Sequence, residues 1–120
     1  MSKRRFILEI GMGNDQYGKD YQKAAARAVE SAIRRSAIPM FATTGLDHKD
    51  MDVRVTVGVQ EPDKVVTEEL RSLMPRGTAK VEAVHGGQNV HNPETGDTIV
   101  IATAAIEAFF EDQSKLWIKD

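Results

Sequence analysis

A glycine-rich stretch after the first apolar run has a spacing that could bind phosphate. Gly13, Gly18 and Lys19 match the Gly-x-x-x-x-Gly-Lys part of a phosphate-binding loop, whose backbone amides surround the phosphates while the lysine meets their terminal oxygens. The next position in such loops is a Ser or Thr that holds magnesium. Here it is Asp20, whose carboxylate would repel phosphate. We therefore expect no magnesium-dependent binding of nucleoside triphosphates.

Asp20 suits a different role, the cap of a helix. Its carboxylate can accept hydrogen bonds from the free amides of a first helical turn, which predicts a glycine-rich strand-to-helix turn. A third interpretation keeps this geometry and changes the ligand, since free amides at a helix start favour a carboxylate or similar small anion. Gly11, Gly13 and Lys19 are then candidate ligand-binding residues, although Asp20 would compete for the same amides.

Glu9 and Arg54 are candidates for acid–base chemistry, because each is a charged residue inside an apolar segment that reads as a strand. If Leu8 and Ile10 face the helices, Glu9 lies on the opposite, helix-free face, and the alternation around Arg54 places it there too. One interpretation is a structural ion pair at a subunit interface, since a buried charge needs a partner. The other makes Arg54 the anchor of a substrate carboxylate and Glu9 an acid or base.

His85 ends a predicted strand and precedes two glycines, Gly86 and Gly87. Such a position exposes side chains and backbone amides, and histidine can carry protons near neutral pH. His85 is therefore a candidate catalytic residue, with Gly86 and Gly87 as candidate ligand-binding residues, unless the histidine is simply solvated. The spacing of His48, His85 and His91 matches no known set of metal ligands, so no metal site is predicted.

The apolar periodicity predicts three strands and two helices, followed by one long apolar segment at the end of the chain. An alanine-rich amphipathic stripe over about 20–36 is typical of a helix that packs closely on a sheet. The final apolar segment could be one long strand or a strand followed by a helix from about residue 103. Its even positions from Val100 to Phe110 are all apolar, which favours a strand. The other predicted elements are strands at 5–10, 51–59 and 78–84 and a helix opened by Pro62, with 88–97 as a loop.

The resulting order, β-α-β-α-β-β, predicts an α/β fold of the α+β kind, with a mixed four-stranded sheet and both helices on one face. The first strand–helix–strand unit should be a right-handed parallel crossover, and the last two strands could pair antiparallel. We expect one domain over residues 1–120. The long connection at 37–50 is of a length that is often functional or interfacial.

The composition excludes several classes of function. The 120 residues include no cysteine, so the chain has no disulfide framework, thiol nucleophile or thiolate metal site. A formal charge of −2 gives no reason to expect nucleic acid as a partner. No apolar run is long enough to span a membrane, and the basic cluster at 3–5 precedes too few apolar residues for an export signal. We expect a soluble cytoplasmic protein without an organic cofactor.

Four segments, at 8–29, 53–59, 84–90 and 97–110, together resemble a small conserved-hypothetical bacterial family known only by a locus tag. The motifs that carry the resemblance are Glu9-x-Gly11-Met12-Gly13, the valine-rich strand with Gly58, and Gly86-Gly87. That family has no established activity, so the resemblance implies no catalytic residue.

The element order also resembles the trimeric chorismate mutase fold, which is shared with imine deaminases and, in tripled form, with ring-opening amidohydrolases of cyanuric acid and barbiturate. The resemblance implies that three units close around an axis and that ligands bind in clefts between them. No Lys–Ser pair of this sequence matches the amidohydrolase dyad, and a shared fold does not fix function.

Two functions follow as expectations. The first is a small homo-oligomeric enzyme, most simply a trimer, that performs acid–base chemistry on a small polar or anionic metabolite in clefts between subunits. The second is a non-enzymatic binding or regulatory module of the same shape. Trp117, near the end of the chain, would cover a neighbouring surface in either case.

Overall fold

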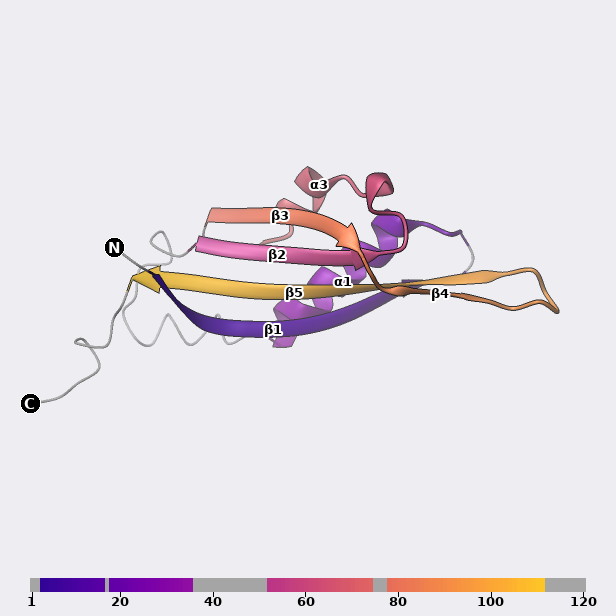
Figure 1. Cartoon of the computed structure of the whole chain (residues 1–120), viewed down its shortest axis with the longest axis horizontal. Helices are drawn as coiled ribbons and strands as arrows, with labels where there is room; N and C mark the ends of the chain where they lie inside the picture. The colour runs from indigo at the N-terminus through magenta and orange to yellow at the C-terminus, as the bar shows by residue number, and fades with distance from the viewer. Residues whose placement is uncertain (1–2, 17, 36–51, 75–77, 112–120) are drawn as a thin grey trace, which may run out of the picture.

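The computed structural model describes residues 3–16, 18–35, 52–74 and 78–111 (Figure 1). The connection at 37–50 and the tail with Trp117 lie outside these residues. The elements in chain order are β1 (Lys3–Asp15), α1 (Tyr21–Arg35), β2 (Asp52–Val59), the 3-10 helix η2 (Pro62–Lys64), α3 (Thr67–Arg71), β3 (Thr78–His85), β4 (Gln88–His91) and β5 (Thr98–Glu111).

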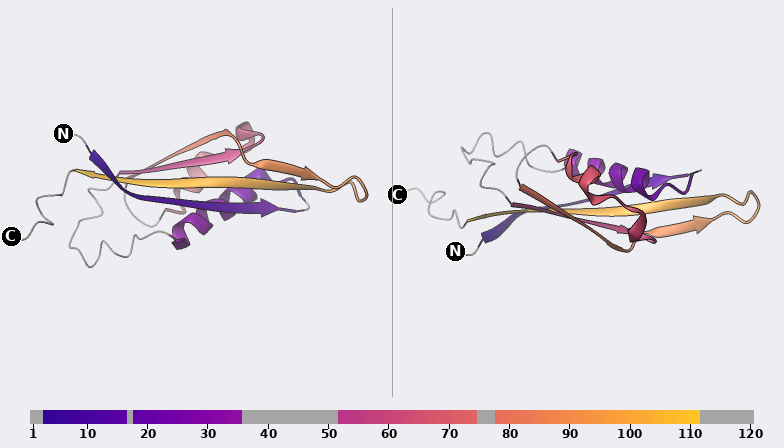
Figure 2. Two further views of the ribbon diagram at one scale, coloured as in Figure 1. Left: turned by 60° about the horizontal axis from the view of Figure 1, so that its bottom comes forward. Right: turned by 90° about the horizontal axis from the view of Figure 1, so that it is seen from above.

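The strands form one mixed sheet in the order β1-β5-β2-β3, and β4 pairs with the first part of β5. β5 is antiparallel to β1, β2 and β4, whereas β2 and β3 are parallel. β1, β2 and β3 therefore run in the same direction, and their carboxyl ends lie toward the same end of the sheet. Both α1 and α3 cover one face, and the other face carries no helix among the described residues (Figure 2).

The core lies between α1 and the sheet. The valines of β2 and the even-numbered residues of β5 from Val100 to Ala108 point into it, as alternation requires. The facing stripe of α1 is mostly alanine, so the helix backbone can approach the sheet closely. This small-residue stripe confirms the helix predicted over 20–36. Its core residues are Tyr21, Ala24, Ala25, Ala28, Val29 and Ala32.

α1 approaches β1 so closely that the strand has room only for glycine there. A Cβ atom at Gly11 would overlap the backbone of Ala28 and Ala32, and one at Gly13 would overlap the backbone of Ala28. Both glycines are buried. At the two positions directly under the helix β1 thus carries glycine, and the large apolar residues Ile10 and Met12 point the other way.

A second close backbone contact lets the chain cross from β3 to β4. A Cβ atom at Gly86 would lie 3.2 Å from the Cα of Gly58, and Gly87 has a φ of +63°, a conformation that favours glycine. The Gln60 side-chain amide donates to the carbonyl oxygens of Gly86 and Gly87 at 3.0 and 3.2 Å. These contacts fix the turn that carries the chain from β3, past the end of β2, to β5.

The α+β class is confirmed, and the final apolar segment is one long strand as expected. Three details of the prediction are wrong. The sheet has a fifth strand, because Gln88–His91 pairs with Thr98–Ile101 across a tight turn. The last two predicted strands do not pair with each other, since β2 lies between β3 and β5. The helix that follows Pro62 is split into η2 and the short α3.

The helix–strand contact predicts a large effect of one methyl group. Gly13→Ala should lower the free energy of unfolding by about 1–3 kcal/mol or more, because the added Cβ forces two backbones apart. Gly96→Asn is the control, since Gly96 has open space around it and a φ of +79° that Asn tolerates. Urea denaturation measures both variants. A Gly13→Ala protein as stable as the wild type would contradict the contact.

Candidate functional site

The end of the sheet where β1, β2 and β3 finish gathers most of the polar groups of interest. Asp15 ends β1, Gln60 follows β2, His85 ends β3, and α1 begins at Tyr21 beside them. Ligands of α/β sheets bind outside the carboxyl ends of parallel strands. This edge is therefore where a candidate site is sought first.

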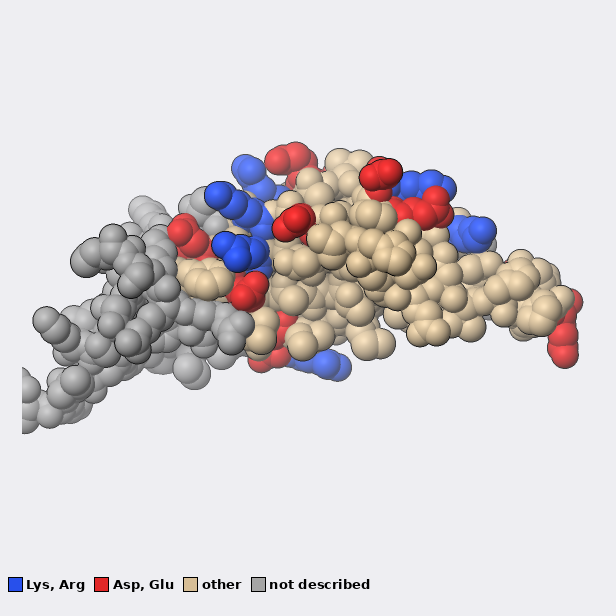
Figure 3. Space-filling model, viewed as in Figure 1, with Lys and Arg blue, Asp and Glu red and all other residues tan. Residues whose placement is uncertain are grey.

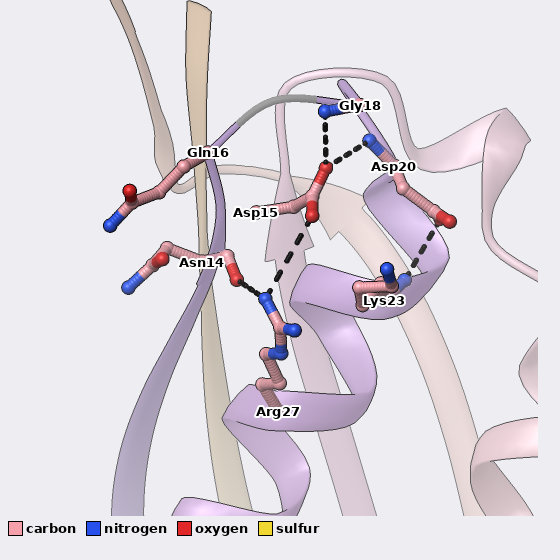
Figure 4. Close-up of a pocket in the computed structure, with 7 residues that line it drawn as sticks. All are labelled: Asn14, Asp15, Gln16, Gly18, Asp20, Lys23 and Arg27. Carbon is pink, nitrogen blue, oxygen red and sulfur yellow. Dashed lines mark hydrogen bonds and ion pairs between the residues drawn. The ribbon is translucent and has the colours of Figure 1, made fainter.

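Asp15 organises the turn that joins β1 to α1 (Figure 4). Its Oδ2 accepts hydrogen bonds from the backbone N–H groups of Gly18 and Asp20, both at 3.0 Å. Its Oδ1 lies 3.8 Å from Nη1 of Arg27, and only 7% of the residue is exposed. The Asp20 amide is the main cause of a lowered pKa for the Asp15 carboxyl. Burial opposes this shift, while the Gly18 amide and the charges of Lys23 and Arg27 add to it.

This arrangement answers the question raised by the glycine-rich stretch. Two of the amides that would bind an external anion already bind the carboxylate of Asp15. Asp20 accepts a hydrogen bond from the backbone N–H of Lys23 at 3.0 Å, which confirms it as the cap of α1. Lys19 precedes the cap with a φ of +49° and is exposed. The turn is thus a self-capped structure in which an internal carboxylate takes the place of a phosphate.

A cleft of about 450 Å³ opens beside this turn. Arg27 borders it from the second turn of α1, and its Nη1 donates to the carbonyl oxygen of Asn14 at 2.6 Å. Lys23 lies one helical turn earlier on the same side of α1. The cleft is lined by Asn14, Asp15, Gln16, Gly18, Asp20, Lys23 and Arg27 (Figure 4).

A second polar group surrounds the buried hydroxyl of Tyr21. Asn89 of β4 donates to this hydroxyl through Nδ2 at 2.8 Å, and the Glu61 carboxyl lies close enough to the same hydroxyl for its pKa to be lowered by it. The Lys64 ammonium lies 5.7 Å from the centre of the Tyr21 ring and 3.4 Å from Oε1 of Glu61. Oδ1 of Asn89 is buried without a hydrogen-bond partner among the described residues.

The charges around Tyr21 affect the ionisation of Glu61. The hydrogen bond from the Tyr21 hydroxyl is the main cause of a lowered pKa for the Glu61 carboxyl. Burial opposes the shift, while Lys64 and, at longer range, Lys19 support it. The anionic form of Glu61 is thus favoured beside Tyr21 and Lys64.

The predicted pair of Glu9 and Arg54 is not formed. Glu9 lies opposite the buried Ile106 and shares the helix-covered face with Gly11, whereas Arg54 is exposed on the helix-free face. The prediction assumed that Leu8 would point at the helices, but the close approach of α1 leaves room only for glycine at positions 11 and 13, so Leu8, Ile10 and Met12 point to the helix-free face. Arg54 instead lies over the Phe109 ring, 5.3 Å from its centre.

The other predicted site residues are also dispersed. His85 is exposed at the end of β3 and does not line the cleft. Gly11 and Gly13 lie under α1, which leaves no room for a ligand on that side. Gly86 donates its N–H to the Val59 carbonyl at 2.9 Å, and the carbonyls of Gly86 and Gly87 accept from Gln60. Catalytic roles for Glu9, Arg54 and His85 stay predictions, but the three do not form one site within a chain.

Metal binding has no structural support in the described ranges, where no group of three or more His, Cys, Asp or Glu side chains could hold an ion. His48, one of the three histidines of the sequence, lies outside them. No described helix is long and apolar enough to cross a membrane.

Asp15, Arg27 and the group around Tyr21 are not among the site residues predicted from the sequence. A signal for Asp15 was present, because an Asp just after a strand often accepts hydrogen bonds from amides a few residues later. No comparable signal joins Tyr21 to Asn89, which are 68 residues apart and meet through the unpredicted strand β4.

The lowered pKa of Asp15 predicts how the stability of the fold depends on pH. A carboxyl whose pKa is lower in the folded than in the unfolded state stabilises the fold above its ordinary value, here 3.8, and loses this effect as the pH falls through the lowered value. Asp15→Asn should therefore unfold at lower urea concentration than the wild type at pH 7. The difference should shrink below pH 3.8. Glu94→Gln, at the exposed hairpin turn, is the control. Equal stability at pH 7 would contradict the role of Asp15.

Removal of the Tyr21 hydroxyl should also destabilise the fold. Tyr21→Phe leaves Nδ2 of Asn89 without its acceptor in a half-buried place, which should cost about 1–3 kcal/mol. In a double-mutant cycle with Asn89→Ala, the losses of unfolding free energy should be far from additive, because both substitutions break the same contact. Additive effects in chemical denaturation would show that the two side chains act independently.

Comparison with known families matches residues 5–108 to the family Lin0512_fam, described as a conserved hypothetical protein. A crystal structure described as an FtsZ-like protein of unknown function from Nostoc punctiforme is 36% identical, with a TM-score of 0.79. The alignment covers 93% of this chain and 99% of that one. Curated proteins give no match. The family match confirms the resemblance to a conserved-hypothetical family and transfers no catalytic residue. This chain therefore belongs to the conserved hypothetical protein family Lin0512_fam.

Proposed function

We propose that this protein is a homo-oligomer, most simply a trimer, that binds a small polar or anionic metabolite in clefts between its subunits. The observation that carries the proposal is the apolar surface on the helix-free face of the sheet. Cytoplasmic location is part of the same proposal, and cell fractionation would test it.

The helix-free face exposes large apolar side chains from two neighbouring parts of the sheet. Leu8, Ile10 and Met12 of β1 are 45, 57 and 62% exposed, and Val90 of β4 is 41% exposed. The strand between them, β5, adds the half-buried Ile99 and Ile101 on the same face. Large contiguous apolar patches on soluble proteins mark interaction surfaces. This apolar surface is therefore suited to burial against another subunit.

The charges on the same face favour a second copy over a strongly charged partner. Figure 3 shows this face, with mostly uncharged atoms over β1, β4 and much of β5 and charged side chains gathered over β2 and β3. On these two strands Arg54 lies beside Lys80, and Glu82 follows two residues later. The surface therefore carries both positive and negative charges. A mixed surface does not create the single-sign field that attracts nucleic acid. Such a surface can pack against the same surface of a second copy, with positive side chains beside negative ones.

Three copies are favoured by the element order, which resembles that of the trimeric chorismate mutase fold, in which three units close around an axis. Ligand clefts between subunits would then lie at the ends of the strands, near the groups around Asp15 and Tyr21. The non-enzymatic binding module gains support from the dispersion of Glu9, Arg54 and His85. An enzyme would have to combine these residues from different copies.

Assembly is tested with a charge placed in the apolar surface. The wild type should have three times the mass of the 13.3 kDa chain by light scattering at micromolar concentration. Ile10→Lys should dissociate it, because burial of an unpaired ammonium costs far more than the contact returns. Glu30→Lys, exposed on α1, is the control and should leave the mass unchanged. A monomeric wild type, or an Ile10→Lys protein that assembles normally, would contradict the proposal.

A further inference from the structure

The cleft beside the Asp15 turn has the size and place of a ligand site. Its volume of about 450 Å³ falls within the range of small-molecule pockets, roughly 300–1,000 Å³. It opens at the end of β1, on the edge of the sheet where three parallel strands finish. The residues that border it come from the strand end, the turn and the first two turns of α1 (Figure 4).

Arg27 presents a fixed guanidinium to this cleft. Its Nη1 is held by the Asn14 carbonyl at 2.6 Å and faces the Asp15 carboxylate at 3.8 Å. Nε and Nη2 make no hydrogen bond or ion pair within the described residues, and half of the side chain is exposed. These two N–H groups form a planar fork that matches the two oxygens of a carboxylate. Because the guanidinium is already fixed, less side-chain entropy is lost on binding.

The other charges of the cleft select among anions. Lys23 adds a second cation and lies close enough to lower the pKa of Asp15. The Asp15 carboxylate is occupied by two amides and Arg27, and Asp20 keeps one carboxylate oxygen beyond its cap to Lys23. A phosphate dianion would meet repulsion from Asp20. A singly charged carboxylate would need only the fork, and an adjacent ammonium could bind Asp20.

We infer that this cleft binds the carboxylate of a small monocarboxylic metabolite, through Arg27 and with Lys23 beside it. The inference rests on the proposed function in one respect, that the ligand is a small polar or anionic metabolite, and it does not depend on the number of subunits. It names the anion and the residues that one chain contributes to the site.

The test is a titration of the full-length protein with sodium pyruvate, L-alanine and inorganic phosphate, followed by backbone amide NMR. Pyruvate or alanine should shift the signals of Gly18 and Lys23, and phosphate should bind more weakly. Arg27→Lys should weaken carboxylate binding about tenfold or more, since lysine keeps the charge but loses the fork. Arg34→Lys, exposed in the last turn of the same helix, is the matched control and should bind like the wild type.

Several results would overturn the inference. These are no shift with either carboxylate, unchanged binding in Arg27→Lys, or tighter binding of phosphate. If Arg27→Lys does not fold, Lys23→Gln replaces it, with a loss of a few-fold expected because one cation is removed. Light scattering on the same samples separates the two proposals. Loss of binding in an intact oligomer concerns the cleft, whereas binding by a monomer contradicts only the assembly.

Discussion

The contact between the backbones of α1 and β1 is the constraint on which the rest of the structure depends. At Gly11 and Gly13 the strand carries no Cβ, so the alanine stripe of the helix lies directly on it. Any larger residue at these two positions would push the helix away from the strand. Leu8, Ile10 and Met12 are thereby turned to the opposite face, where the described part of the chain has no helix to cover them.

The same contact sets the position of the polar edge. A helix this close to β1 brings its first two turns beside the end of the strand, so that Arg27 reaches back to the Asn14 carbonyl and the Asp15 carboxylate. Asp15 in turn binds the amides that lead into the helix. On the other side, the glycine contact between Gly58 and Gly86 brings β4 to β5, and with it Asn89 to Tyr21. Both polar groups thus depend on close backbone contacts that glycine permits.

The sequence predicts those elements whose period is unambiguous. α1 and β2 are read correctly because the spacing of their apolar residues fits one structure only, and the long β5 because the alternation of its apolar residues favours a strand over a helix. The direction of the β1 side chains is not read correctly, since both sides of the strand are plausible core faces until the glycines are seen to lie under alanines. The wrong direction paired Glu9 with Arg54, and the missed β4 hid the Tyr21–Asn89 contact. Contacts between residues far apart in the chain leave no periodic trace.

The central claim is that β1 points its large side chains away from α1 and that other copies of the chain cover them. The chain has no cysteine, so Met12→Cys introduces a single thiol whose labelling rate reports its accessibility, with Glu30→Cys on α1 as the exposed reference. We predict that the thiol at position 12 reacts as fast as the reference in dilute solution, and much more slowly at concentrations where the protein assembles. Slow labelling at every concentration would show that the side chain is buried within its own chain. Fast labelling at every concentration would show that no copy covers it, and either result would contradict the account.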